Sequence, residues 1–251
     1  MKPTFEQIFR AATAIITFFL MLLLLIPVAI VLLFLSFGRF SNFIVEKIAP
    51  TFAKIALWIL GIRFRIKKHV DPIPAPAVYI SNHSSTIDLL TILALGLPRV
   101  RFIAKWELQY NPLFLILGRL TGQVFIKRNQ SEKAIATLQK TYSRVKRQNL
   151  SIFAAPEGSR KHEGIIGTFK KGPFRIAMDL GYPIVPIYFQ GNKELVPGDS
   201  LLAKKGECTA YIHQPIDTED WTLENLEEKI SEVRSLYLNW AGVDEENQVS
   251  V

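Results

Sequence analysis

The sequence predicts an α/β domain with a mainly parallel, mixed sheet flanked by helices, preceded by an N-terminal helical membrane anchor. Three observations support this prediction. An apolar run without any charged residue spans positions 11–37. From about residue 65, short apolar segments alternate with longer helical patterns, which is typical of parallel strands joined by crossover helices. At 251 residues, the chain is long enough for one domain with a complete core.

The apolar run at 11–37 is dominated by Leu, Ile, Val and Phe and shows no polar face, unlike a helix packed on a core. It exceeds the roughly 20 residues that cross a hydrocarbon layer of about 30 Å. A secretion signal would have an apolar region of only about 7–15 residues before a cleavage site. We therefore expect a membrane anchor. Pro27 allows either a kinked span or a helix–turn–helix that dips into one leaflet.

Basic residues follow the anchor at Arg39, Lys47 and Lys54, and again as a cluster at 63–68. Because positive charge is enriched on the cytoplasmic side of membrane proteins, the rest of the chain is expected to face the cytoplasm. The expected location is a cell membrane, such as the inner membrane of a bacterium. The segment at 43–62 mixes apolar and charged residues, which fits either interfacial helices or ordinary packed helices.

These patterns divide the chain into an anchor with interfacial helices at 1–64, an α/β domain at 65–243 and a polar tail at 244–251. Strands are expected at 77–81, 100–104, 123–126, 151–154, 184–189 and 208–213. Helices are expected near 87–95, 112–120, 131–147, 169–180 and 223–240.

The chain is both apolar and basic, with 49% hydrophobic residues and a net charge of +8. Such a composition favours an anionic membrane surface or an acidic ligand. Nucleic acid is the other common partner of a basic chain, and the membrane anchor argues against it. The single cysteine, Cys208, excludes an internal disulfide and a multi-cysteine metal site. Its strand-like neighbours indicate a buried residue and not a nucleophile.

The strongest local motif is Ser-Asn-His-Ser-Ser-Thr-Ile-Asp at 81–88. On a continuous helix, His83 and Asp88 would lie about 140° apart, so they can meet only if His83 precedes the helix and folds back over its first turn. A strand–loop–helix segment supplies that geometry, with Ser84 or Ser85 as the helix cap. A carboxylate on one imidazole nitrogen fixes the tautomer and leaves the other nitrogen as a base. A purely structural histidine is the alternative.

Charged residues follow other predicted strands in the same way. Arg128 follows the strand at 123–126, while Glu157 and Arg160 follow the strand at 151–154. In open α/β sheets, ligand sites are assembled from the loops at the carboxyl ends of the strands. One base and several cations that converge there indicate a substrate with a hydroxyl group and a phosphate.

Four sequence blocks then appear in order: 82–88 with its Asn-His and Asp, 105–128 from Lys to Arg, Pro-Glu-Gly-Ser-Arg at 156–160, and Pro-Ile-Val-Pro at 183–186. They resemble the four blocks of the glycerolipid acyltransferases, specifically the 1-acylglycerol-3-phosphate acyltransferase family. The resemblance covers roughly residues 77–190. An N-terminal anchor is also typical of that family.

Three positions depart from the family pattern. The second block usually has glycine where this chain has Leu115, and often an acidic residue where it has Lys127. The third block usually opens with phenylalanine, and here Ala155 takes that position. None of these departures touches the histidine, the two acidic residues or the arginines of the blocks.

The resemblance implies an O-acyltransferase domain at 65–243. Its reaction would move a fatty acyl group from an acyl-CoA or acyl-carrier-protein thioester to the sn-2 hydroxyl of 1-acyl-glycerol-3-phosphate, giving phosphatidic acid in phospholipid biosynthesis. The implied partners are membrane lipids, lysophosphatidate and the thioester donor, with no nucleic acid. No cofactor or metal is expected beyond the thioester co-substrate.

By the same resemblance, His83 is the catalytic base and Asp88 orients its ring. The implied substrate-binding residues are Lys105, Arg128, Glu157, Gly158 and Arg160. The lipid hydroxyl is itself the nucleophile, so no covalent acyl-enzyme is required.

Other functions fit less well. The acceptor could be another lyso-lipid, or the chain could be a non-catalytic membrane-surface scaffold of the same fold, although a scaffold needs neither His83 nor Asp88. A metal site could draw on these two residues with His162 and His213, but no H-E-x-x-H spacing is present. The chain also lacks the G-x-S-x-G of serine hydrolases and the phosphate-binding loop of nucleotide-dependent kinases.

Overall fold

The computed structural model describes residues 4–36, 39–126, 132–160, 164–197, 200 and 202–243. Within these residues, seven strands form one sheet in the order β1-β7-β6-β2-β5-β3-β4. Neighbouring strands are parallel except for the antiparallel pair β6 and β7, so the predicted mainly parallel, mixed sheet is confirmed. The strands are β1 Ile62–Lys68, β2 Val78–Ser81, β3 Val100–Lys105, β4 Val124–Ile126, β5 Ser151–Ala154, β6 Ile184–Gln190 and β7 Gly206–Ile212.

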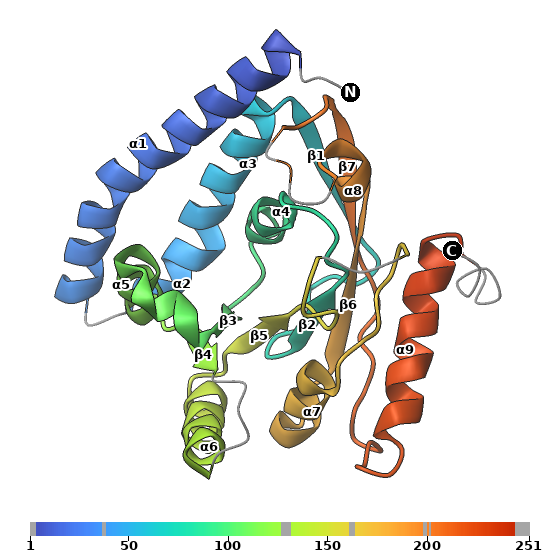
Figure 1. Cartoon of the computed structure of the whole chain (residues 1–251). Coiled ribbons are helices and arrows are strands. Elements are labelled where there is room, and N and C mark those ends of the chain that lie inside the picture. The colour runs from blue at the N-terminus through green and yellow to red at the C-terminus, as the bar shows by residue number, and fades with distance from the viewer. Residues whose placement is uncertain are drawn as a thin grey trace.

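Helices cover both faces of the sheet (Figure 1). One face packs against α6 Glu132–Arg147, α7 Lys171–Leu180 and α9 Leu226–Trp240. The other face packs against α4 Asp88–Ala94, α1 Phe5–Leu35, α3 Ala49–Ile59 and a π-helical turn η1 at Ile44–Ile48. The short helix α2 Ser41–Phe43 directly precedes η1. The remaining helical segments are the 3-10 helix η2 Trp106–Tyr110, α5 Pro112–Leu120 and α8 Asn192–Leu195.

The central strands are buried on both sides because helices cover both faces. In β2, Val78 and Ile80 point into the core that contains α7 and α9, while Tyr79 points into the core beside α4. This arrangement explains the continuous apolar run of the strand. It also leaves the loops at the strand ends as the places where polar groups gather.

Strand β1 was not predicted from the sequence. It spans the predicted boundary at residue 64 and pairs in parallel with β7 at the edge of the sheet. The basic residues that suggested a membrane-proximal segment alternate with apolar ones, so Ile62 is buried while Arg63 and Arg65 are turned outward. Arg65 forms a salt bridge with Glu207 of β7 at 2.9 Å. The basic cluster is therefore the solvent-facing side of an edge strand.

Helix α1 is docked on the domain along one of its faces. Ala11 and Ala14 are buried, and the Arg10 guanidinium donates a hydrogen bond of 2.9 Å to the Leu60 carbonyl. Within the described residues, we find no helix whose length and apolar character would let it cross a membrane. The predicted N-terminal helices are present, whereas their predicted role as a membrane anchor is not supported.

Candidate active site

His83 lies in the loop between β2 and α4, and its ring meets the first residue of that helix. Nδ1 of His83 is 2.8 Å from Oδ2 of Asp88. The Asp88 side chain is 1% exposed and the His83 side chain 28%, so a buried carboxylate holds a partly exposed ring. The predicted fold-back of His83 over the helix start is confirmed. Because Nδ1 is held by the carboxylate, proton exchange with a substrate falls to Nε2.

The buried Asp88 carboxylate accepts several hydrogen bonds. Oδ2 also accepts from the backbone N–H groups of Ser84 and Ser85, each at 2.8 Å. Oδ1 accepts from Nδ2 of Asn192 at 2.8 Å. Donors on both oxygens stabilise the ionised carboxylate, which a buried acid without donors would not sustain.

The predicted serine cap of the helix is wrong. Helix α4 begins at Asp88 with Ile87 at the cap position, where no described side chain caps the helix. The Asp88 side chain instead accepts hydrogen bonds from the preceding backbone N–H groups of Ser84 and Ser85. Ser85 Oγ accepts a 3.3 Å bond from the Ile87 N–H and donates a 2.6 Å bond to the Val196 carbonyl. Ser85 therefore ties the histidine loop to the segment that follows β6.

Glu157 braces the same loop from the neighbouring strand. It lies just after β5, which pairs in parallel with β2, and it is 5% exposed. Its Oε1 accepts a 2.9 Å hydrogen bond from the backbone N–H of His83, and Oε2 accepts one of 3.2 Å from Gly167. The expected convergence of these two strand ends is confirmed. In this structure the carboxylate contacts the backbone that carries the base.

Gly158 occupies a backbone position that other residues would strain, with φ +66°. A Cβ built on Gly158 would lie 2.8 Å from Nζ of Lys170, so the lysine side chain passes directly over this glycine. The Lys170 N–H also donates to the Pro156 carbonyl at 2.9 Å. Lys170 was not among the predicted site residues. Its place ten residues after the third block was the signal that could have identified it.

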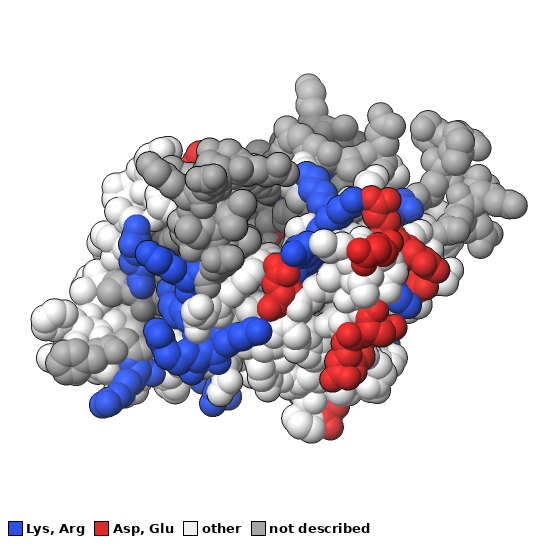
Figure 2. All heavy atoms as spheres, turned by 90° about the horizontal axis from the view of Figure 1, so that it is seen from below, with Lys and Arg blue, Asp and Glu red and all other residues white. Residues whose placement is uncertain are grey.

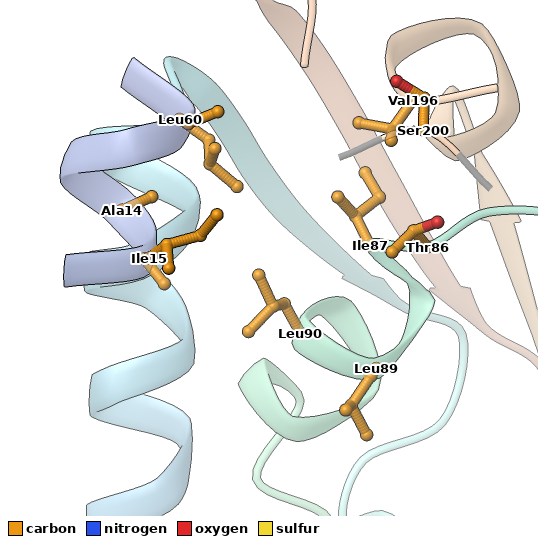
Figure 3. Close-up of a pocket in the computed structure, with 11 residues that line it drawn as sticks. Ala14, Ile15, Leu60, Thr86, Ile87, Leu89, Leu90, Val196 and Ser200 are labelled. Carbon is orange, nitrogen blue, oxygen red and sulfur yellow. The ribbon is translucent and has the colours of Figure 1, made fainter. Parts of the chain in front are cut away.

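An apolar cavity of about 250 Å³ lies beside the histidine loop (Figure 3). Its lining comes from α1, α3, the start of α4 and the segment after α8, including Ile15, Leu60, Leu90 and Val196. Ile87, which directly precedes Asp88, lines it as well. The His–Asp pair thus lies directly beside the lining of an apolar cavity.

Comparisons with known proteins identify the family of the chain. A family model described as Acyltransferase matches residues 62–190, which is just over half of the chain. The 1-acyl-sn-glycerol-3-phosphate acyltransferase of Haemophilus influenzae is 31% identical over 210 residues, which cover 83% of this chain and 86% of that protein. The chain belongs to the 1-acylglycerol-3-phosphate acyltransferase family.

Two further comparisons differ in the shares of the two chains that they cover. The chloroplastic acyltransferase LPAT1 of Arabidopsis thaliana is 32% identical over 79% of this chain, which spans 55% of the plant protein. The crystal structure of the 1-acyl-sn-glycerophosphate acyltransferase PlsC from Thermotoga maritima superposes with a TM-score of 0.74. It is 22% identical and covers 92% of this chain and 94% of its own, so it shares the fold.

The structure describes the other predicted substrate-binding residues with different completeness. Arg160 is partly buried in the loop that carries Glu157 and Gly158. For Lys105 the structure describes the backbone, which ends β3 between β5 and β4. Arg128 lies outside the described residues. The structure therefore gathers His83, Asp88, Glu157, Gly158 and Arg160 at two adjacent strand ends.

Two further side chains considered from the sequence are Cys208 and His213. Burial raises the pKa of the Cys208 thiol to about 12, so the group is protonated near neutral pH, as expected of a buried residue. His213 stacks on Trp240 with ring centroids 3.5 Å apart, and burial lowers its pKa to about 4. Within the described residues, no group of three or more His, Cys, Asp or Glu side chains is arranged to hold a metal ion. His162 lies outside those residues.

Proposed function

We propose that this acyltransferase moves a fatty acyl group from a thioester to the sn-2 hydroxyl of 1-acyl-glycerol-3-phosphate, giving phosphatidic acid. The observation that carries the proposal is the pair formed by His83 Nδ1 and Asp88 Oδ2, 2.8 Å apart beside an apolar cavity. A base held in one tautomer and a space for an acyl chain are the two requirements of this reaction.

In the proposed reaction, Nε2 of His83 accepts the proton of the acceptor hydroxyl as its oxygen attacks the thioester carbonyl carbon. The new carbon–oxygen bond forms first, and the carbon–sulfur bond then breaks as the tetrahedral intermediate collapses. The thiolate leaves and takes up the proton from the imidazolium, which restores the base. Asp88 stabilises the imidazolium in between, as the acid of a Ser-His-Asp triad does.

The apolar cavity supports a fatty acyl chain as the transferred group or as part of the acceptor. Burial of each methylene group contributes about 0.8 kcal/mol, so even a part of the chain in this space contributes several kilocalories. Ile87 lines the cavity one residue before Asp88, so a hydrocarbon chain bound there would lie close to the His–Asp pair.

Cations near the same strand ends support binding of the acceptor phosphate. Arg160 lies on the loop after β5. Lys170 lies directly before α7, and its side chain passes over Gly158. We include Lys105 and Arg128 from the second block in this role. Charge-assisted hydrogen bonds from such side chains to phosphate are shorter and stronger than neutral ones.

We also propose that the enzyme works on a membrane surface, with its domain on the cytoplasmic side. Large apolar side chains are exposed on the N-terminal helices, among them Phe5 at 83%, Phe34 at 79% and Trp58 at 78%. On the face shown in Figure 2, Lys and Arg predominate on the side of these helices, and Asp and Glu on the side of α9. An apolar face beside basic side chains is attracted to anionic lipid.

The test is a matrix of purified protein with lysophosphatidate, other lysophospholipids and glycerol 3-phosphate, each supplied with acyl-CoA or with acyl-acyl-carrier protein. Products are identified by mass spectrometry. We expect phosphatidic acid from lysophosphatidate to be the main product with at least one donor. A stronger reaction with another acceptor would change the proposed substrate, and no transfer to any acceptor would favour the scaffold.

A further inference from the structure

Asn192 touches the Asp88 carboxylate from a distant part of the chain. It begins α8 directly after β6, at a turn where Gly191 has φ +92° and where a Cβ would lie 2.8 Å from the Glu207 carbonyl oxygen. The Asn192 side chain is buried, and its Nδ2 donates to Asp88 Oδ1 at 2.8 Å and to Thr91 Oγ1 at 3.0 Å. This tight turn brings the Asn192 amide into contact with the Asp88 carboxylate.

The two oxygens of Asp88 have different partners. Oδ2 meets His83 Nδ1 and two N–H groups of its own loop, whereas Oδ1 receives its donor from Asn192. If that donor were removed, Oδ1 would lose this bond in a buried position, at a cost that favours rotation of the carboxylate toward other donors. Such rotation would move Oδ2 away from the imidazole.

The orientation of the Asn192 amide satisfies the Asp88 carboxylate and leaves its own oxygen unpaired among the described residues. Oδ1 of Asn192 is buried without a hydrogen-bond partner among the described residues. The reversed amide would place this oxygen against Asp88 Oδ1, so that two acceptors would face each other. Buried polar atoms are usually paired, so the unpaired Asn192 oxygen is a cost that the bond from its Nδ2 to the buried carboxylate offsets.

We infer that Asn192 is a positioning residue, whose amide fixes the plane of the Asp88 carboxylate so that Oδ2 faces His83. The inference rests on the proposed function of this pair as the catalytic base. A second contact from the same segment agrees with it, because Ser85 Oγ donates to the Val196 carbonyl at 2.6 Å. The segment after β6 thus holds the histidine loop at two points.

Kinetics of Asn192→Ala test the inference. We expect kcat to fall about ten- to a hundredfold, the usual effect of removing a hydrogen bond to a charged group, while KM for lysophosphatidate stays near that of the wild type. Thr218→Ala is the matched control. It removes another buried hydrogen bond, from Thr218 Oγ1 to the Tyr182 carbonyl at 3.0 Å, near the opposite end of β6. This control should lower stability and leave kcat unchanged.

Asn192→Asp separates positioning from packing. The substituted side chain has the same shape, but two adjacent buried carboxylates cannot both ionise and therefore share one proton. While the pair holds this proton, one carboxyl group can still donate a hydrogen bond to the other. As the pH rises, the pair loses the proton and with it this hydrogen bond. We expect kcat/KM of this variant to decline at high pH, where the wild type remains active. A wild-type pH profile and a wild-type kcat in both Asn192 variants would overturn the inference.

An NMR measurement distinguishes failure of this inference from failure of the proposed function, because it needs no turnover. In protein labelled with ¹⁵N-histidine, we expect a low-field signal from the proton between His83 Nδ1 and Asp88. Asn192→Ala should shift or broaden this signal, and Thr218→Ala should leave it in place. An identical signal in Asn192→Ala and the wild type would contradict positioning, whether or not the wild type transfers acyl groups.

Discussion

Two buried carboxylates support His83, one at its ring and one at its backbone. Asp88 contacts Nδ1, and Glu157 accepts a 2.9 Å hydrogen bond from the His83 N–H. Both act on the same base by different means, since the first sets the tautomer and the second sets the position of the loop. Substitution of either carboxylate should therefore lower kcat. Loss of a side chain that binds the acceptor phosphate should instead raise KM for the acceptor.

Glu157→Gln tests whether Glu157 positions the base or binds the acceptor. The amide can accept from only one of the two N–H groups that the carboxylate now serves, those of His83 and Gly167. We expect kcat to fall about tenfold or more, with little change in KM for lysophosphatidate. Steady-state kinetics over a range of acceptor concentrations measure both. A rise in KM at constant kcat would instead assign Glu157 to the acceptor site.

Arg160→Ala should show the opposite pattern. If the guanidinium holds the acceptor phosphate, its loss costs on the order of 1.5–3 kcal/mol of acceptor binding, or roughly ten- to a hundredfold in KM. The dependence on the thioester donor should change far less. Measured donor and acceptor dependence in the same preparation provides the control. Unchanged use of the acceptor would place Arg160 in the donor site or in a structural role.

At the scale of elements, the strands between 77 and 190 were predictable because each covered strand is a short apolar run between turn residues. The α-helices of this range were predicted as well, whereas the 3-10 helix η2 was not. The strand at Ser151–Ala154 and the helix at Pro112–Leu120 have the predicted bounds. Strand β1 was missed because its alternating basic residues at 63, 65 and 67 also fit a membrane-proximal segment. An edge strand shows one polar side, and the sequence alone does not say which partner covers the other.

The docking of α1 on the domain gives a prediction at this scale. Arg10 donates to the Leu60 carbonyl at 2.9 Å and to the Ala203 carbonyl at 3.4 Å, so it links α1 to the end of α3 and to the segment before β7. Arg10→Ala should lower the free energy of unfolding by about 1–3 kcal/mol, because two carbonyls lose a charged donor. Thermal unfolding followed by circular dichroism measures this. An unchanged midpoint would show that apolar packing alone holds α1.

At the scale of the whole molecule, the groups of the candidate site come from segments far apart in the sequence. The donor and acceptor of the Asn192–Asp88 bond are 104 residues apart, and His83 and Glu157 are 74 apart. The His–Asp pair was predictable because both residues sit in one short motif. The role of Asn192 was not, since a lone asparagine after a strand has no pattern and only the β2–β6 pairing brings it near.

The proposed attachment to a membrane would depend on the N-terminal helices α1 and α3. The exposed apolar side chains of α1 and α3, such as Phe34 and Trp58, predict binding to anionic lipid vesicles that persists in high salt. Vesicle co-sedimentation with and without about 1 M salt measures this, since ionic attraction is screened within about 3 Å under that condition. Release by salt would mean that basic side chains alone hold the protein. Retention after a carbonate wash would support the anchor expected from the sequence.

The measurement that tests the central claim most directly is acyl transfer by His83→Ala, in protein whose circular dichroism and vesicle binding match those of the wild type. If the imidazole held by Asp88 is the base, transfer from thioester to lysophosphatidate should fall by about a hundred- to ten-thousandfold. Chelators should not change the wild-type activity. Near-normal transfer by the folded, membrane-bound His83→Ala protein would contradict the mechanism.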